Sequence, residues 1–139
     1  MQRKTFLTFA SLVPMAVGSI ALLAPAFLLG ELKGAETSGA AEVMARTVGV
    51  LLFSVGLVSF LCRADPDSPT LRALLIGNLV IQLGLLPIDP LAYLSGVFVG
   101  LGSFVPNTIL HVLLAMAFAY YLRAMARGEP RRKIGRAHV

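Results

Sequence analysis

The sequence predicts an all-α integral membrane protein: a four-helix bundle with a short interfacial helix between the third and fourth spans. Composition is the first reason, because 57% of the 139 residues are hydrophobic and 14% are charged, against about 25% charged in soluble domains. The mean hydropathy of +0.82 agrees with this. Charge spacing is the second reason, because 5–30, 47–62, 73–88 and 90–122 contain no Asp, Glu, Lys or Arg. A spanning helix needs about 20 mostly apolar residues, so these stretches set the number of spans.

The first charge-free stretch predicts one helix over Phe6–Leu29, bent at Pro14 and Pro25. A cleaved signal peptide is the alternative, with residues 24–26 as the cleavage motif. However, the apolar run exceeds the 7–15 residues of a signal sequence, and proline occupies the middle of that motif. We therefore expect an uncleaved membrane anchor.

The second and third spans have recognisable limits. The second reaches spanning length only by extending outward past Arg46, which places it at about 42–62. The third starts with Ser68 as a helix N-cap and Pro69 at the first helical position, and it runs to about Leu86.

The last charge-free stretch is too long for one span and too short for two, which would need about 40 residues. Asp89 and Pro90 resemble an N-cap followed by the first helical residue, so we expect a short helix over 90–100 at the outer interface. A kinked continuation of the third span is the alternative. The fourth span then covers about 106–126.

Basic residues predict the orientation. Lys33 and Arg46 lie on one side of the predicted topology. The other side carries Arg3, Lys4, Arg63, Arg72, Arg123, Arg127, Arg131, Arg132, Lys133 and Arg136. By the positive-inside rule, we expect both termini to be cytoplasmic. Topology thus accounts for the net charge of +5, and no nucleic-acid partner is expected.

The last residues of the chain match a sequence that is not of protein origin. Ile134–Val139 is the translation of a widely used short-read sequencing adapter, so we interpret residues 133–139 as an artefact and expect one domain over residues 1–132. An ordinary short basic tail is the alternative.

Small residues recur every seven positions in the first three spans, which is typical of close helix packing along a left-handed seam. Gly96 and Gly100 add a G-x-x-x-G pair on the outer helix, where we expect a dimer contact. The residues of the seven-residue seams are Ser11 and Gly18, Gly49 and Gly56, and Gly77 and Gly84.

Polar residues inside the spans are the candidate site, because polar groups in hydrocarbon are costly. Asn78 and Gln82 lie one turn apart on the third span, and Asn107 and His111 one turn apart on the fourth. Counting helix rise from the cytoplasmic arginines puts Gln82 about 15 Å and His111 about 18 Å into the membrane. We therefore predict a Gln82–His111 contact.

Three roles are open for His111: a hydrogen-bonded core histidine, a ligand for a quinone carbonyl or lipid headgroup, or an axial haem ligand. In the second case Gln82, Asn78 and Asn107 would line the same site. One histidine in the spans is too few for haem without a dimer or a second ligand type, so no cofactor and no metal are expected.

Arg46 and Asp89 both lie about 24–26 Å up from the cytoplasmic arginines, at the outer boundary. We expect them to form a topology-fixing ion pair, with Glu42, one turn before Arg46, as the alternative partner. An anion or headgroup site at this outer mouth is a further alternative.

Catalysis is not expected. The sequence lacks G-x-x-x-x-G-K-[ST], H-E-x-x-H and G-x-S-x-G motifs, and no acidic pair lies inside the membrane. Cys62 is the single cysteine, whereas quinone-linked disulfide-forming enzymes need cysteine pairs.

The stretch from Ala45 to Leu57, the charged turn before Leu71-Arg72-Ala73, and the run from His111 to Leu122 resemble small four-span bacterial membrane proteins of unknown function. The resemblance covers most of residues 5–125 and implies architecture only. Two functions are left: a non-catalytic structural, assembly or interaction subunit, or a lipid- or quinone-type carrier with its site between the third and fourth spans. The expected partners are the lipid bilayer and either a second copy or a membrane complex.

Overall fold

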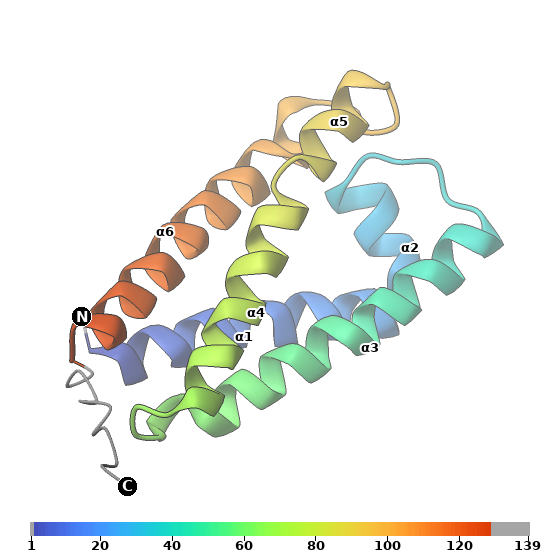
Figure 1. The fold of residues 1–139 in the computed structure, drawn as a ribbon. Coiled ribbons are helices and arrows are strands. Elements are labelled where there is room, and N and C mark those ends of the chain that lie inside the picture. Colours follow the sequence, from blue (N-terminus) through green and yellow to red (C-terminus); the bar gives the residue numbers. More distant parts are fainter. Residues whose placement is uncertain (1, 129–139) are drawn as a thin grey trace, which may run out of the picture.

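The computed structural model describes residues 2–128, and within them every regular element is a helix (Figure 1). The segment interpreted as adapter-derived, 133–139, lies outside the described residues. The elements are α1 (Arg3–Leu23), α2 (Pro25–Phe27), the π-helix η1 (Leu28–Leu32), α3 (Gly39–Leu61), the 3-10 turn η2 (Cys62–Ala64), α4 (Pro69–Leu85), α5 (Ile88–Leu94), the 3-10 turn η3 (Leu101–Ser103) and α6 (Val105–Gly128).

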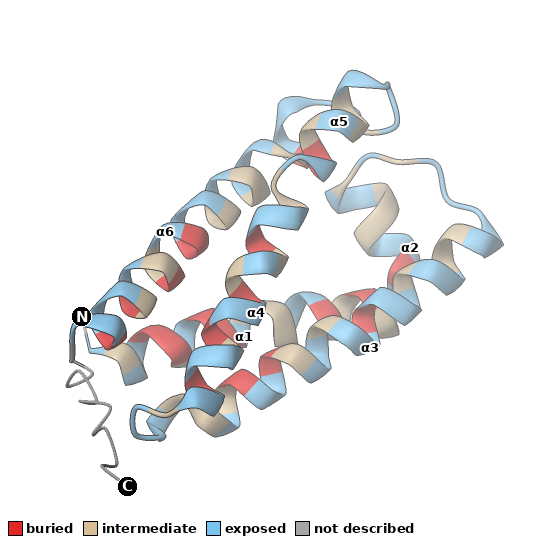
Figure 2. Cartoon of the chain, viewed as in Figure 1, coloured by how far each residue is buried: buried red, intermediate tan, exposed pale blue. Residues whose placement is uncertain are grey.

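Four segments are long and apolar enough to cross a membrane: Arg3–Leu23, Gly39–Ala64, Pro69–Leu94 and Leu101–Arg127. Their outward faces are exposed over most of their length (Figure 2), and these faces carry many large apolar side chains. Soluble monomers rarely expose apolar patches above a few hundred Å². Length, composition and this surface together suggest a multi-pass membrane protein.

The first span is shorter than predicted. The backbone leaves the helical region at Ala24, with φ −137° and ψ 60°, and the chain continues as α2 and η1. Pro25 explains the break, because its ring disfavours the helical conformation of the residue before it. Pro14 remains inside α1.

Two serines cap the next helices. The Ser68 hydroxyl accepts a hydrogen bond from the Leu71 N–H at 3.1 Å, which confirms the predicted cap. At α3, Ser38 accepts from the Ala41 N–H at 3.2 Å, so this helix begins three residues earlier than predicted. Both caps satisfy N–H groups that a helix start leaves unpaired.

The long helices pack as two pairs, α1 along α3 and α4 along α6. The backbones of α1 and α3 nearly touch: a Cβ atom on Gly18 would lie 2.7 Å from the Gly49 carbonyl oxygen, and one on Gly56 would lie 2.7 Å from the Ser11 carbonyl oxygen. Real Cβ atoms do not approach so closely, so only glycine fits. The predicted seam between the first two spans is confirmed.

The apolar core lies where the start of α1 meets the start of α4 and the end of α6, near the N-terminus (Figure 1). The Phe6 ring lies 4.9 Å from the rings of both Phe118 and Tyr121, edge-on to the first and stacked on the second. Arg3 forms an ion pair with Asp67 in the loop before α4. The two helix pairs are therefore joined most firmly at the end that holds the N-terminus.

Two other groups of small residues do not pack against a helix of the same chain. A Cβ atom at Gly77 or Gly84 would meet no atom within 4 Å, so the α4 seam is uncovered. The placement of Gly96 and Gly100 on the outer helix is wrong, because α5 ends at Leu94 and both glycines lie in the following loop, where they form no helical G-x-x-x-G pair. Their φ angles of +76° and +82° explain the glycines, since other residues rarely adopt this conformation.

Candidate functional site

Three of the polar residues predicted inside the spans, Gln82, His111 and Asn107, lie in a row between α4 and α6 that continues to α5. The imidazole Nδ1 of His111 lies 2.6 Å from the side-chain oxygen of Gln82, which is the predicted contact between the third and fourth spans. On the other side of the ring, Nε2 lies 3.2 Å from the side-chain nitrogen of Asn107. The same Asn107 nitrogen donates to the Asp89 carboxylate at 2.6 Å.

Hydrogen-bond chemistry fixes the direction of each contact in this row. The Gln82 oxygen only accepts, so Nδ1 of His111 carries the proton and donates it. Nε2 then accepts from one Asn107 N–H, while the other Asn107 N–H goes to Asp89. A neutral imidazole protonated at Nδ1 thus fits all three contacts, whereas a proton on Nε2 would face the Asn107 amide N–H.

Asp89 ends the row at an ion pair with Lys33, whose ammonium also donates to the Ser103 carbonyl oxygen at 3.2 Å. Lys33 comes from the loop after η1 and lies 5.1 Å from the centre of the Phe98 ring. Asp89 is buried, with 8% of its surface exposed. The pair therefore ties the first interhelical loop to α5 and to the start of α6.

The expected Arg46–Asp89 ion pair is wrong. Arg46 lies on α3, which packs against α1, and its guanidinium donates to the Leu22 carbonyl at 3.3 Å. It lies 4.0 Å from the Glu42 carboxylate, the alternative partner. Helix C-terminal carbonyls attract cations, so the end of α1 competes for this side chain.

Asp89 was also expected to cap the short helix. Instead α5 begins at Ile88, with Pro87 at the N-cap position and no capping side chain. The Asp89 carboxylate is occupied by Lys33 and Asn107. The Asp89 side chain therefore makes tertiary contacts in place of the predicted capping hydrogen bond to its own helix.

Asn78 does not join the His111 row. Its amide donates to the Ser59 hydroxyl on α3 at 3.1 Å and to the Leu74 carbonyl at 3.0 Å. Both Asn78 and Ser59 are buried. The polar face predicted for the third span is thus divided, with Asn78 joining α4 to α3 and Gln82 joining α4 to α6.

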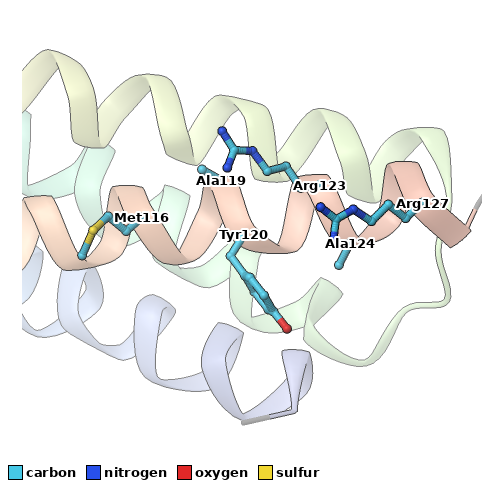
Figure 3. A pocket seen from close by; sticks show the side chains of 6 residues that line it. All are labelled: Met116, Ala119, Tyr120, Arg123, Ala124 and Arg127. Carbon is cyan, nitrogen blue, oxygen red and sulfur yellow. The ribbon is translucent and has the colours of Figure 1, made fainter.

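Cavities border the helices at two places that bear on the candidate site. The first, of about 280 Å³, lies between α3 and α4 and is lined by Ser54, Val55, Val58, Leu74, Gly77, Asn78 and Ile81. The second, of about 700 Å³, lies along α6 and is lined by Met116, Ala119, Tyr120, Arg123, Ala124 and Arg127 (Figure 3). Asn78 is the predicted ligand residue that borders the first, and its amide is already bonded to protein atoms.

Within residues 2–128, no three His, Cys, Asp or Glu side chains are grouped to hold a metal ion. Chemically, the row of Lys33, Asp89, Asn107, His111 and Gln82 is a set of matched donors and acceptors. Such a row fixes the positions of helices, because each member would be costly without its partner.

Sequence reasoning missed Lys33 as a member of this row. The available signal was that Lys33 and Arg46 are the two basic residues on their side of the topology. Counting helix rise favoured Arg46, since it lies within a span, whereas a loop residue has no depth that can be counted.

No protein-family model, curated protein or solved structure matches the chain.

Proposed function

We propose that this protein is a non-catalytic membrane subunit that acts by helix–helix association. Its proposed partner is a second copy of itself, bound through the outward face of α4. The observation that carries the proposal is the uncovered seam of Gly77 and Gly84. It repeats the seven-residue spacing of Gly49 and Gly56, along which α3 lies against the backbone of α1.

The outward face of α4 has the composition of a helix contact in lipid. Ala73, Gly77, Val80 and Gly84 share this face by helical spacing, and all four are exposed, with Gly77 at the edge that borders the cavity between α3 and α4. The opposite face of α4 is buried and carries Leu71, Leu75, Asn78 and Gln82. Helices in a bilayer associate by close packing at small residues, because lipid supplies no hydrophobic force between them.

Two copies related by a two-fold axis would present this face to each other, since such an interface uses the same patch on both subunits. The polar row supports a non-catalytic role, because its donors and acceptors bind one another. For the same reason the alternative, a lipid or quinone carrier with His111, Gln82 and Asn107 as ligands, has less support.

We further propose a bacterial inner-membrane location with cytoplasmic termini. Among the described residues, the end that holds the N-terminus carries six basic residues against Asp65 and Asp67. The opposite end carries Lys33 and Arg46 against Glu31, Glu36, Glu42 and Asp89. Positive-inside charge bias favours this orientation. The six basic residues are Arg3, Lys4, Arg63, Arg72, Arg123 and Arg127.

Cysteine cross-linking in native membranes tests the association. With Cys62 replaced by Ser, Val80→Cys places a thiol at the centre of the α4 face, where the side chain is 62% exposed. We expect an oxidised dimer from this variant, and its loss when Gly77→Val and Gly84→Val are added.

Leu113→Cys is the matched control, since Leu113 lies in the interior of α6 and is 54% exposed, close to the 62% of Val80. Equal cross-linking at Val80→Cys and Leu113→Cys would indicate random collision and would overturn the proposal.

A further inference from the structure

We propose that the terminus-side half of α6 carries a binding site for an acidic phospholipid. The cavity of about 700 Å³ along this helix supplies the space (Figure 3). This inference requires that the protein spans a membrane, but it is independent of the α4 contact and of self-association.

The lining residues follow the order of an amphiphile. Met116, Tyr120, Arg123 and Arg127 are spaced by four, three and four residues, so they share one face of α6. All four are exposed. Along the helix, this face changes from an apolar side chain to an aromatic ring and then to two guanidinium groups. An acyl chain, the interface and a phosphate follow one another in the same order in a lipid leaflet.

Charge identifies the headgroup as anionic. Within residues 2–128, no carboxylate lies within ion-pair distance of Arg123 or Arg127. Other arginines at this end are engaged. Arg3 pairs with Asp67, and Arg63 stacks 3.7 Å from the centre of the Phe60 ring and donates to the Phe60 carbonyl oxygen at 2.6 Å.

Two guanidinium groups one turn apart fit a phosphate, because arginine binds phosphate through paired, charge-assisted hydrogen bonds. The Tyr120 ring contacts the Tyr121 ring edge-on at 5.2 Å, but Tyr120 and Met116 are still 66% and 58% exposed. A free phosphate would use the arginines and leave this exposed apolar surface uncovered. A phospholipid uses both parts of the face, so the lipid is the occupant that matches the whole cavity.

Native mass spectrometry of the full chain in mild detergent tests this site. The protein is titrated with phosphatidylglycerol and with phosphatidylcholine that has the same acyl chains. Each basic residue near an anionic membrane surface contributes about fivefold to binding. We therefore expect phosphatidylglycerol to bind more tightly, each of Arg123→Gln and Arg127→Gln to reduce this preference about fivefold, and the double variant to abolish it.

Lys4→Gln is the matched control, because it removes one exposed positive charge at the same end without touching the cavity. Retained preference in Lys4→Gln supports the site, whereas an equal loss would mean a general charge effect and would overturn it. Unchanged preference in the double arginine variant, or equal binding of both lipids to the wild type, would also overturn it. Inorganic phosphate that displaces the lipid at millimolar concentration would identify a free-anion site and contradict the lipid. Far-UV circular dichroism verifies that each variant keeps its helices.

Discussion

The Lys33–Asp89 ion pair concentrates two opposite charges at the edge of the predicted hydrocarbon layer. Their side chains are 19% and 12% exposed, so neither charge is fully solvated. Asn107 and the Ser103 carbonyl add hydrogen bonds to the two partners. A buried pair of this kind contributes little by its presence, but the removal of one partner leaves the other charge uncompensated.

Lys33→Met should therefore destabilise the fold by about 3 kcal/mol, the lower end of the range for a broken buried pair. Adding Asp89→Asn should recover most of this loss, because the remaining carboxylate charge is then gone. Unfolding of the purified protein in mixed micelles measures both changes. Arg46→Gln is the control, since an exposed ion pair contributes at most about 1 kcal/mol. If Lys33→Met unfolds like Arg46→Gln, the pair does not secure the loop.

The hydrogen-bond directions around His111 predict its tautomer. Because Gln82 accepts at Nδ1 and Asn107 donates to Nε2, the proton should reside on Nδ1. Nitrogen-15 NMR of histidine-labelled protein tests this in a His138→Ala background, which leaves one imidazole to observe. Asn107→Leu removes the donor at Nε2 and should change the Nε2 resonance more than that of Nδ1. A proton found on Nε2 in the unchanged network would contradict the assignment.

The sequence was sufficient for Gln82–His111 and insufficient for Lys33–Asp89, for one physical reason. Both members of the first pair lie inside helices, where a rise of about 1.5 Å per residue converts chain position into depth. Lys33 lies in the loop that follows the π-helix η1, and a loop has no regular rise per residue. The most charged contact of the site was therefore the one that the sequence could not identify.

At the scale of elements, the same spacing of small residues has two outcomes. Along α1 and α3 it brings two backbones together, whereas on α4 it is uncovered. Periodicity tells which face of a helix carries the small residues, but it does not tell which helix covers that face. Proline also has two structural outcomes, because Pro14 is accommodated within α1 whereas Pro25 begins the separate helix α2. The four spans and the Ser68 cap were predictable because they depend on local sequence alone.

Glycine-to-alanine substitutions should have opposite signs on the two seams. At Gly49 the new Cβ would lie 2.7 Å from the Gly18 carbonyl oxygen, so the helices must separate, and we expect a loss of about 1–3 kcal/mol. At Gly77 nothing lies within 4 Å, so the better helix propensity of alanine should stabilise the monomer by up to about 1 kcal/mol. Unfolding at high detergent-to-protein ratio, where the chain is monomeric, measures both. The same sign at both positions would contradict the distinction between covered and uncovered seams.

At the scale of the whole molecule, the aromatic core and the His111 row lie at different levels along the helices. The aromatic core around Phe6 and Phe118 joins the two helix pairs at the end with the N-terminus. The row from Gln82 to Lys33 runs toward the opposite end, where loops rather than long helices meet. Charge follows the same axis, with basic residues in excess at the end of the aromatic core.

An even number of spans with this charge bias predicts that both ends of the chain face the cytoplasm. Green fluorescent protein fused after residue 128, or before residue 2, should fluoresce in the cells of a bacterial host, because it folds only in the cytoplasm. Alkaline phosphatase inserted at Glu36, in the exposed loop between η1 and α3, should be active, because it needs the oxidising outer compartment.

The charge bias also predicts which change should disturb the orientation. Arg3→Gln with Lys4→Gln removes two of the six described basic residues at the terminus side and should produce a minor inverted population. If the fusions at the two ends reported opposite compartments, the chain would cross the membrane an odd number of times. That result would contradict the four-span topology and the antiparallel pairing of α4 and α6, on which the Gln82–His111 contact depends.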